Sequence, residues 1–200
     1  MLKKLKIKLI EIVISFNKKF YLLSAHNHLN KIYNFFSENE NFDYILVKKS
    51  KDFPLIKPGS DFDLYVSNES EFANLINSYF KKYDKYETKY VNSKIGSLQV
   101  DLYYKDKFLY KFDLMEATNA SKLFSKSFVN DSLIKKEVFS FIFKGKKMSI
   151  NVPNNSYENL IRFIEQRLYP NKIHHLVYLD KLSDDQKTEL KVMVKKYTNI

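Results

Sequence analysis

The chain has 200 residues, which is enough for one domain or for one domain with a helical appendage. Its hydrophobic content of 44% and its few Gly and Pro residues exclude a disordered chain. It contains no cysteine, which excludes disulfide bonds, zinc–thiolate sites and thiol nucleophiles and fits a reducing, cytoplasmic location.

The formal net charge of +11 suggests a polyanionic partner such as nucleic acid. The kind of basic residue argues against this, since only Arg162 and Arg167 among the 34 basic residues are arginines. Arginine is the side chain that best matches base edges and phosphates, and AT-rich coding produces lysine without selection for function. A basic nucleic-acid-binding module is therefore kept only as an alternative.

The N-terminal segment, residues 3–23, is predicted to be a helix with four lysines among the first eight residues of the chain. Its apolar run, residues 9–16, is interrupted by Glu11, so we expect neither a transmembrane segment nor a secretory signal. A basic helix that contacts a membrane surface is one interpretation. An ordinary core-packing helix is favoured, because apolar positions cover most of the helical circumference.

Hydrophobic periodicity predicts an α+β fold, with a mixed sheet flanked by helices over residues 1–152 and a C-terminal helical region over residues 153–200 that packs on it. A capping box, formed by Ser183 and Gln186, opens the last helix. The predicted helices cover 3–23, 25–37, 69–83, 156–168 and 183–197, and the predicted strands cover 42–48, 62–66, 85–91, 98–104, 108–115, 138–143 and 147–152.

The sharpest local feature is the segment that reads Gly-Ser-Asp-Phe-Asp-Leu from position 59. Side chains alternate along a strand, so Asp61 and Asp63 should point to one face while Phe62 points to a core. Two carboxylates so close together repel each other, and a hard divalent cation such as Mg²⁺ compensates well. The alternative is a pair of solvent-facing aspartates at the start of a strand.

Two further aspartates, Asp101 and Asp113, each lie between apolar residues of a predicted strand. A carboxylate there is costly unless it is paired or bound to a metal ion. If the hairpin turns near Asp106, the two aspartates fall nearly opposite each other on one face. A salt bridge from Asp113 to Lys111 or Lys105 is the alternative.

These residues resemble the nucleotidyltransferase superfamily, which has the DNA polymerase β-like fold. Its members carry a strand, a Gly-Ser turn, a loop, an Asp-x-Asp strand and a third acidic residue on a neighbouring strand, and the resemblance covers residues 42–115. Many members also carry a C-terminal helical region. The clear departure is at the turn, where Ser50 falls on the family's serine but Lys49 replaces the glycine that lets the backbone approach a triphosphate.

The resemblance implies a Mg²⁺- or Mn²⁺-dependent nucleotidyltransferase that moves a nucleoside monophosphate from a nucleoside triphosphate, such as ATP, to a hydroxyl or phosphate acceptor. A small molecule, sugar phosphate or glycan precursor is expected as acceptor rather than nucleic acid. The lost glycine favours the alternative of a non-catalytic member that acts as a binding or antitoxin-like partner. The implied catalytic residues are Asp61, Asp63, Asp101 and Asp113, of which the first three would hold the metal, and the implied triphosphate contacts are Lys48, Lys49, Ser50, Gly59 and Ser60.

The basic side chains of the C-terminal region leave two interpretations open. Arg162 and Arg167 share a predicted helix with Glu165, which indicates either a helix-surface ion pair or a pair that binds an acceptor or phosphate in a cleft. Adjacent histidines, such as His174 and His175, do not share one face of a helix, so we expect a structural role rather than a joint metal site.

Overall fold

The computed structural model describes residues 26–47, 49, 52–92, 97–116 and 126–198. The predicted helix over 3–23, with its membrane-surface interpretation, lies outside these residues, as do Lys48 and Ser50. In the described ranges, no helix is both long and apolar enough to cross a lipid bilayer.

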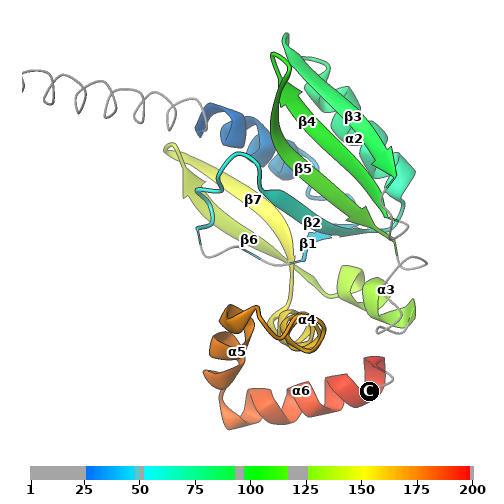
Figure 1. Ribbon diagram of the computed structural model, residues 1–200, viewed down its shortest axis with the longest axis vertical. Coiled ribbons are helices and arrows are strands. Elements are labelled where there is room, and N and C mark those ends of the chain that lie inside the picture. Colours follow the sequence, from blue (N-terminus) through cyan, green and yellow to red (C-terminus); the bar gives the residue numbers. More distant parts are fainter. Residues whose placement is uncertain (1–25, 48, 50–51, 93–96, 117–125, 199–200) are drawn as a thin grey trace, which may run out of the picture.

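The architecture is α+β, as the sequence predicts, and its centre is a mixed five-stranded sheet (Figure 1). The strand order is β1-β2-β5-β4-β3, and a separate hairpin, β6-β7, lies beside it. The strands are β1 (Tyr44–Leu46), β2 (Asp61–Val66), β3 (Tyr86–Asn92), β4 (Leu98–Tyr104), β5 (Lys107–Met115), β6 (Lys136–Phe143) and β7 (Lys146–Pro153).

The helices fall into two groups, one on each side of the sheet. A helix over residues 26–38 and α2 (Glu69–Phe80) form the first group, and Asn68 caps α2 by accepting a hydrogen bond from the backbone of Glu71. The second group contains α3 (Lys126–Ile134), α4 (Asn155–Leu168), α5 (Ile173–Asp180) and α6 (Asp184–Tyr197). The predicted capping box at Ser183 and Gln186 is present at the start of α6.

The first helix group covers one face of the sheet and forms the larger core. Phe62 of β2 and Phe112 of β5 lie in this core, and their stacked rings are 5.4 Å apart. Apolar side chains alternate with polar ones along both strands, so the apolar set faces the helices and the polar set faces away. The prediction that Phe62 points into a core while its neighbours do not is therefore confirmed.

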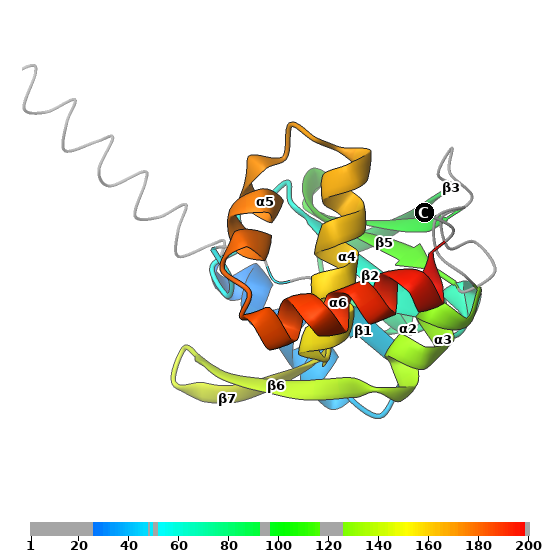
Figure 2. The same cartoon turned by 90° about the horizontal axis from the view of Figure 1, so that it is seen from below.

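The second helix group is joined to the other face by a smaller apolar cluster. Tyr65 of β2 packs there with Phe128 of α3, and Tyr157 and Tyr197 join it from α4 and α6. Figure 2 shows α3, α4 and α6 lying together beneath the sheet. This cluster lies at the carboxyl-terminal end of β2, where it also contacts Met115 of β5. Asp61 and Asp63, nearer the start of β2, are not part of it.

The hairpin between β4 and β5 turns through Lys105 and Asp106, both of which have positive φ angles, of 48° and 62°. Tyr103 pairs with Phe108, but the next pair is Leu102 with Tyr110, so the register shifts by one residue. Beyond the shift, Asp101 lies opposite Lys111 and Asp113 lies opposite Gln99. The two aspartates are therefore diagonal neighbours on one face of the sheet, in agreement with the expectation that they lie nearly opposite each other on one face.

Replacing Phe128 with alanine should lower the free energy of unfolding by about 3–5 kcal/mol, because a fully buried aromatic ring that links α3 to the sheet is lost. Urea denaturation followed by circular dichroism measures the loss. The matched control is Phe108→Ala, since the side chain of Phe108 on β5 is 42% exposed and its loss should cost about 1 kcal/mol or less. Equal losses in the two variants would contradict the described packing.

Candidate functional site

Three carboxylates lie together on the open face of the sheet, on two strands that run parallel. Asp61 and Asp63 are both on β2, and in the parallel register they lie beside Lys111 and Asp113 of β5. Residues paired in this way share one face of a sheet. The predicted placement of Asp61 and Asp63 on the same side of their strand is therefore what the structure has.

The ammonium group of Lys111 lies between two of these carboxylates. Its Nζ is 3.1 Å from Asp61 Oδ2 and 3.1 Å from Asp113 Oδ2. The salt bridge that the sequence offered as the alternative for Asp113 is therefore present, and it also includes Asp61. The side chains of Lys111 and Asp113 are 23% and 26% exposed, so water screens this contact less than a fully exposed pair.

The pKa values of Lys111 and Asp113 are both shifted by this arrangement. Burial lowers the pKa of Lys111, but its hydrogen bonds to Asp113 and Asp61 and their charges outweigh burial, so the pKa lies above its usual value. The pKa of Asp113 lies above its usual value, because burial and the charges of Asp61 and Asp101 raise it and together outweigh the hydrogen bond and charge of Lys111, which lower it. Burial is thus the main reason why the Asp113 carboxylate is harder to ionise than usual, and the neighbouring carboxylates add to it.

Asp101 lies one strand further from β2 than Asp113 does. It is on β4, opposite Lys111, and its Oδ1 accepts a hydrogen bond of 2.6 Å from Gln99 Nε2. The strand that adjoins β2 is β5, so Asp113 is the carboxylate that the register brings beside Asp63. Sequence separation assigned the family's third acidic residue to Asp101. In the structure, Asp113 is the acidic residue that lies next to Asp63 on the neighbouring strand.

The carboxylate oxygens of this group are of the chemical type that a hard divalent cation binds, because Mg²⁺ and Mn²⁺ prefer oxygen ligands. In the part of the chain that the structure describes, no group of three His, Cys, Asp or Glu side chains is arranged to hold a metal ion as it stands. The position between Asp61 and Asp113 is taken by the Lys111 ammonium. Asp61, Asp63 and Asp113 are thus the residues that could hold a metal, with Lys111 displaced.

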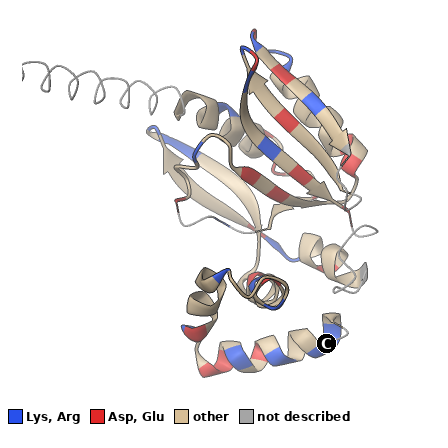
Figure 3. Ribbon diagram, viewed as in Figure 1, with Lys and Arg blue, Asp and Glu red and all other residues tan. Residues whose placement is uncertain are grey.

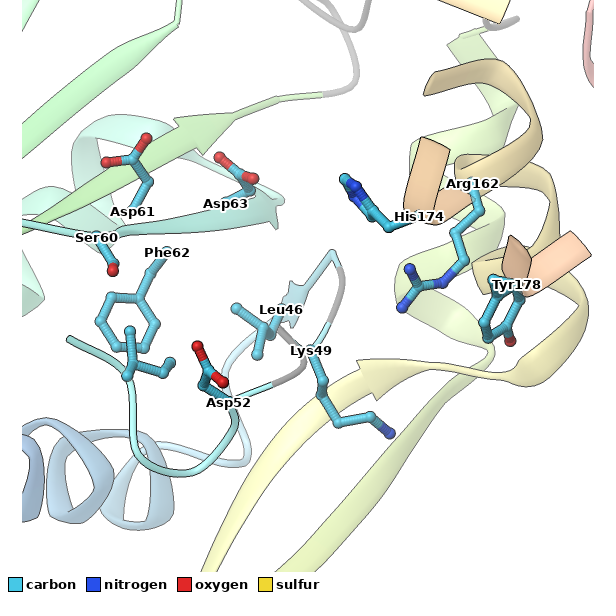
Figure 4. Close-up of a pocket in the computed structure, with 11 residues that line it drawn as sticks. Leu46, Lys49, Asp52, Ser60, Asp61, Phe62, Asp63, Arg162, His174 and Tyr178 are labelled. Carbon is cyan, nitrogen blue, oxygen red and sulfur yellow. The ribbon is translucent and has the colours of Figure 1, made fainter. Parts of the chain in front are cut away.

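A pocket of about 590 Å³ opens beside Asp61 and Asp63 (Figure 4). This volume lies within the range of pockets that bind small molecules and cofactors. Its walls come from β1 and β2, from the loop before β2, and from α4 and α5. The lining residues are Leu46, Lys49, Asp52, Ile56, Ser60, Asp61, Phe62, Asp63, Arg162, His174 and Tyr178.

The loop before β2 supplies the described part of the predicted triphosphate contacts. Gly59 has a φ of +89°, which a residue with a side chain adopts only with strain, and its N–H donates to Leu109 O at 2.6 Å. The turn places Ser60 at the pocket wall. Lys49 also lines the pocket, with its Nζ 4.1 Å from the centre of the Phe139 ring.

The opposite wall is built by Arg162, His174 and Tyr178 from α4 and α5. Arg162 forms an ion pair with Glu158 instead of Glu165, with Nη2 2.6 Å from Glu158 Oε1. Arg167 lies over the Phe163 ring at 5.4 Å and is not among the lining residues. The two arginines therefore do not form one pair, and only the first of them faces the pocket.

Helix α5 is held against α4 by a buried contact behind this wall. His175 is fully buried, and its Nε2 is 2.9 Å from Glu165 Oε2. This contact agrees with the structural role expected for His175. Its neighbour His174 is exposed and lines the pocket, as does Tyr178, and sequence reasoning assigned neither of them to a site.

Neither a scan of the sequence against protein-family models nor a search of curated proteins finds a match. The resemblance to the nucleotidyltransferase superfamily therefore stays a prediction that rests on the residues themselves and on their arrangement.

Replacing Lys111 with methionine should leave Asp61 and Asp113 without their shared ammonium group. In buffer without divalent cations we expect a loss of about 1–3 kcal/mol of unfolding free energy, less than a fully buried pair would lose. Mg²⁺ should then stabilise the variant more than the wild type, because the carboxylates are no longer compensated. Urea unfolding with and without Mg²⁺ measures both effects.

The control for this variant is Lys85→Met, just before the edge strand β3, where the lysine side chain is 52% exposed and pairs with Asp84. It should change neither the stability nor the response to Mg²⁺ measurably. An identical Mg²⁺ response in wild type and the Lys111 variant would show that the ammonium does not compete with a cation.

Proposed function

We propose that the protein is a divalent-metal-dependent nucleotidyltransferase, which transfers a nucleoside monophosphate from a nucleoside triphosphate to a hydroxyl or phosphate group of a small acceptor. The observation that carries this proposal is the parallel pairing of β2 with β5, which sets Asp113 beside Asp63. The pocket next to Asp61 and Asp63 has room for a ligand of this class.

In the proposed reaction, an acceptor oxygen attacks the α-phosphorus of the triphosphate. The bond from that phosphorus to its bridging oxygen breaks, pyrophosphate leaves, and the acceptor proton passes to a base. Bound Mg²⁺ or Mn²⁺ would neutralise phosphate charge and lower the pKa of the acceptor hydroxyl. Asp61, Asp63 and Asp113 would hold it, and their place on two paired strands keeps them fixed during the reaction.

The pocket walls give the remaining residues their proposed roles. Ser60 and Lys49 lie on the loop side, where they would contact the phosphates of the triphosphate. The wall from α4 and α5 would face the acceptor. A pocket of this size has room for a small acceptor. Figure 3 shows basic residues lying among acidic ones on α6 and along the sheet, so these elements do not form a uniformly basic surface for nucleic acid.

One observation favours a second candidate, a non-catalytic protein that uses the same pocket for binding. The Lys111 ammonium already supplies positive charge between Asp61 and Asp113. In such a protein this charge would replace the metal permanently, and Lys49 in place of the family's turn glycine would be tolerated. The two candidates differ in whether nucleotide binding depends on a divalent cation.

The proposal predicts that Asp61→Asn and Asp63→Asn each lower transfer by at least about a hundredfold, since the loss of one charged oxygen weakens the binding of the cation that holds the triphosphate. Differential scanning with each of the four nucleoside triphosphates, with and without Mg²⁺, finds the substrate. Release of pyrophosphate in the presence of sugar and sugar-phosphate acceptors then measures transfer.

The control is Asp84→Asn, whose carboxylate is 88% exposed after α2 and away from the pocket. It should behave as the wild type. Asp61→Asn also loses the ion pair with Lys111, so the melting temperature of each site variant without ligand is measured to separate a loss of transfer from a loss of folding. A wild-type protein whose melting temperature responds to no nucleotide in the presence of Mg²⁺ would refute the enzyme.

A further inference from the structure

Arg162 is held in a fixed orientation at the pocket wall, and its side chain is only 11% exposed. Its Nε and Nη2 both donate to Glu158 Oε1, at 3.0 and 2.6 Å. Its Cζ lies 4.2 Å from the centre of the Tyr178 ring, so the guanidinium is held at one edge and on one face. A guanidinium has five N–H donors, and Glu158 takes two of them.

The residues around Arg162 are themselves fixed. The Tyr178 hydroxyl donates to Asn159 Oδ1 at 3.1 Å, which sets the ring on which the guanidinium lies. The buried contact of His175 with Glu165 sets the distance between α5 and α4. The guanidinium is therefore preorganised, and a ligand that binds it does not have to immobilise a flexible side chain first.

Charge is unevenly distributed over the pocket walls. Asp61 and Asp63 lie on one side, and Arg162 with Tyr178 lies on the other (Figure 4). A negatively charged group of a ligand is repelled by the aspartates and attracted by the guanidinium. The fork of an arginine matches two oxygens of a phosphate group, which the single ammonium of a lysine does not.

We propose that Arg162 is a phosphate-binding residue of this pocket and that Glu158 and Tyr178 are its positioning residues. The phosphate belongs either to the nucleoside triphosphate or to a phosphorylated acceptor. The inference rests on the proposed function for the reaction that the phosphate compound undergoes, while the binding of phosphate at Arg162 is measurable without turnover.

The test compares Arg162→Gln and Arg162→Lys with Arg167→Gln, which changes the chain's other arginine, on the same helix but off the pocket. Calorimetry measures the affinity for three probes, namely ATP with Mg²⁺, adenosine, and glucose 1-phosphate. Both Arg162 variants should bind at least one phosphorylated probe about tenfold to a hundredfold more weakly, since a charged hydrogen bond is lost. Adenosine binding and the Arg167 variant should be unchanged.

The probe that loses affinity identifies the source of the phosphate: ATP indicates the triphosphate, and glucose 1-phosphate indicates an acceptor. Removing Arg162 alone leaves Glu158 nearly buried and unpaired, which can unfold the protein. The double variant Glu158→Gln/Arg162→Gln removes both charges and should give the same loss of affinity with a melting temperature nearer to the wild type.

Unchanged affinity for both phosphorylated probes in the folded Arg162 variants would overturn the inference. If Asp61→Asn still abolishes Mg²⁺-dependent ATP binding in that case, the proposed function stands without it. In the opposite result, the Arg162 variants are the ones that lose affinity, while the aspartate variants bind ATP and Mg²⁺ as the wild type does. That result supports the phosphate site at Arg162 and contradicts the proposed enzyme activity. A wild-type protein that binds neither phosphorylated probe overturns both.

Discussion

Electrostatic repulsion between carboxylates on paired strands is the constraint that the rest of this site must satisfy. Asp63 and Asp113 are brought together by backbone pairing, with Asp61 next along β2. Repulsion between carboxylates disfavours their charged forms, and positive charge among them favours these forms. Lys111 supplies some of it, but the pKa of Asp113 is still raised. In the proposed function a divalent cation supplies further positive charge at this site, and this links the geometry to metal and nucleotide chemistry.

The two apolar clusters explain how the sheet can carry this group of charged side chains on its open face. The larger one buries the inner face of the sheet against α2 and the helix over residues 26–38, which makes β2 and β5 rigid. The smaller one fixes the second helix group to the end of the outer face and leaves the aspartates uncovered. Because α4 and α5 are anchored so close to Asp63, their polar side chains become a pocket wall instead of a distant surface.

Much of the fold was predictable, because strands and helices with clear periodicity carry their own signal. The alternation at 61–66 located β2 and gave the faces of Asp61 and Phe62, and the capping box located the start of α6. The α3 segment was missed because its apolar residues show little helical asymmetry. The site was only half predictable. Its carboxylates are local in sequence, whereas the wall with Arg162 and Tyr178 depends on how α4 and α5 pack together, which no local pattern specifies.

Because of the one-residue shift in the β4–β5 hairpin, the number of residues in that hairpin decides whether the polar side chains of β4 and β5 lie on the same face. With the two-residue turn alone, Asp101 would share a side with Tyr110, which is buried in the larger core. The extra residue at the shift restores the match between the polar sides of the two strands. A single deletion or insertion near Leu109 would therefore turn the buried side chains of half a strand toward solvent and the polar ones toward the core. Only compensated changes in length, such as one on each side of the turn, should be tolerated there during evolution.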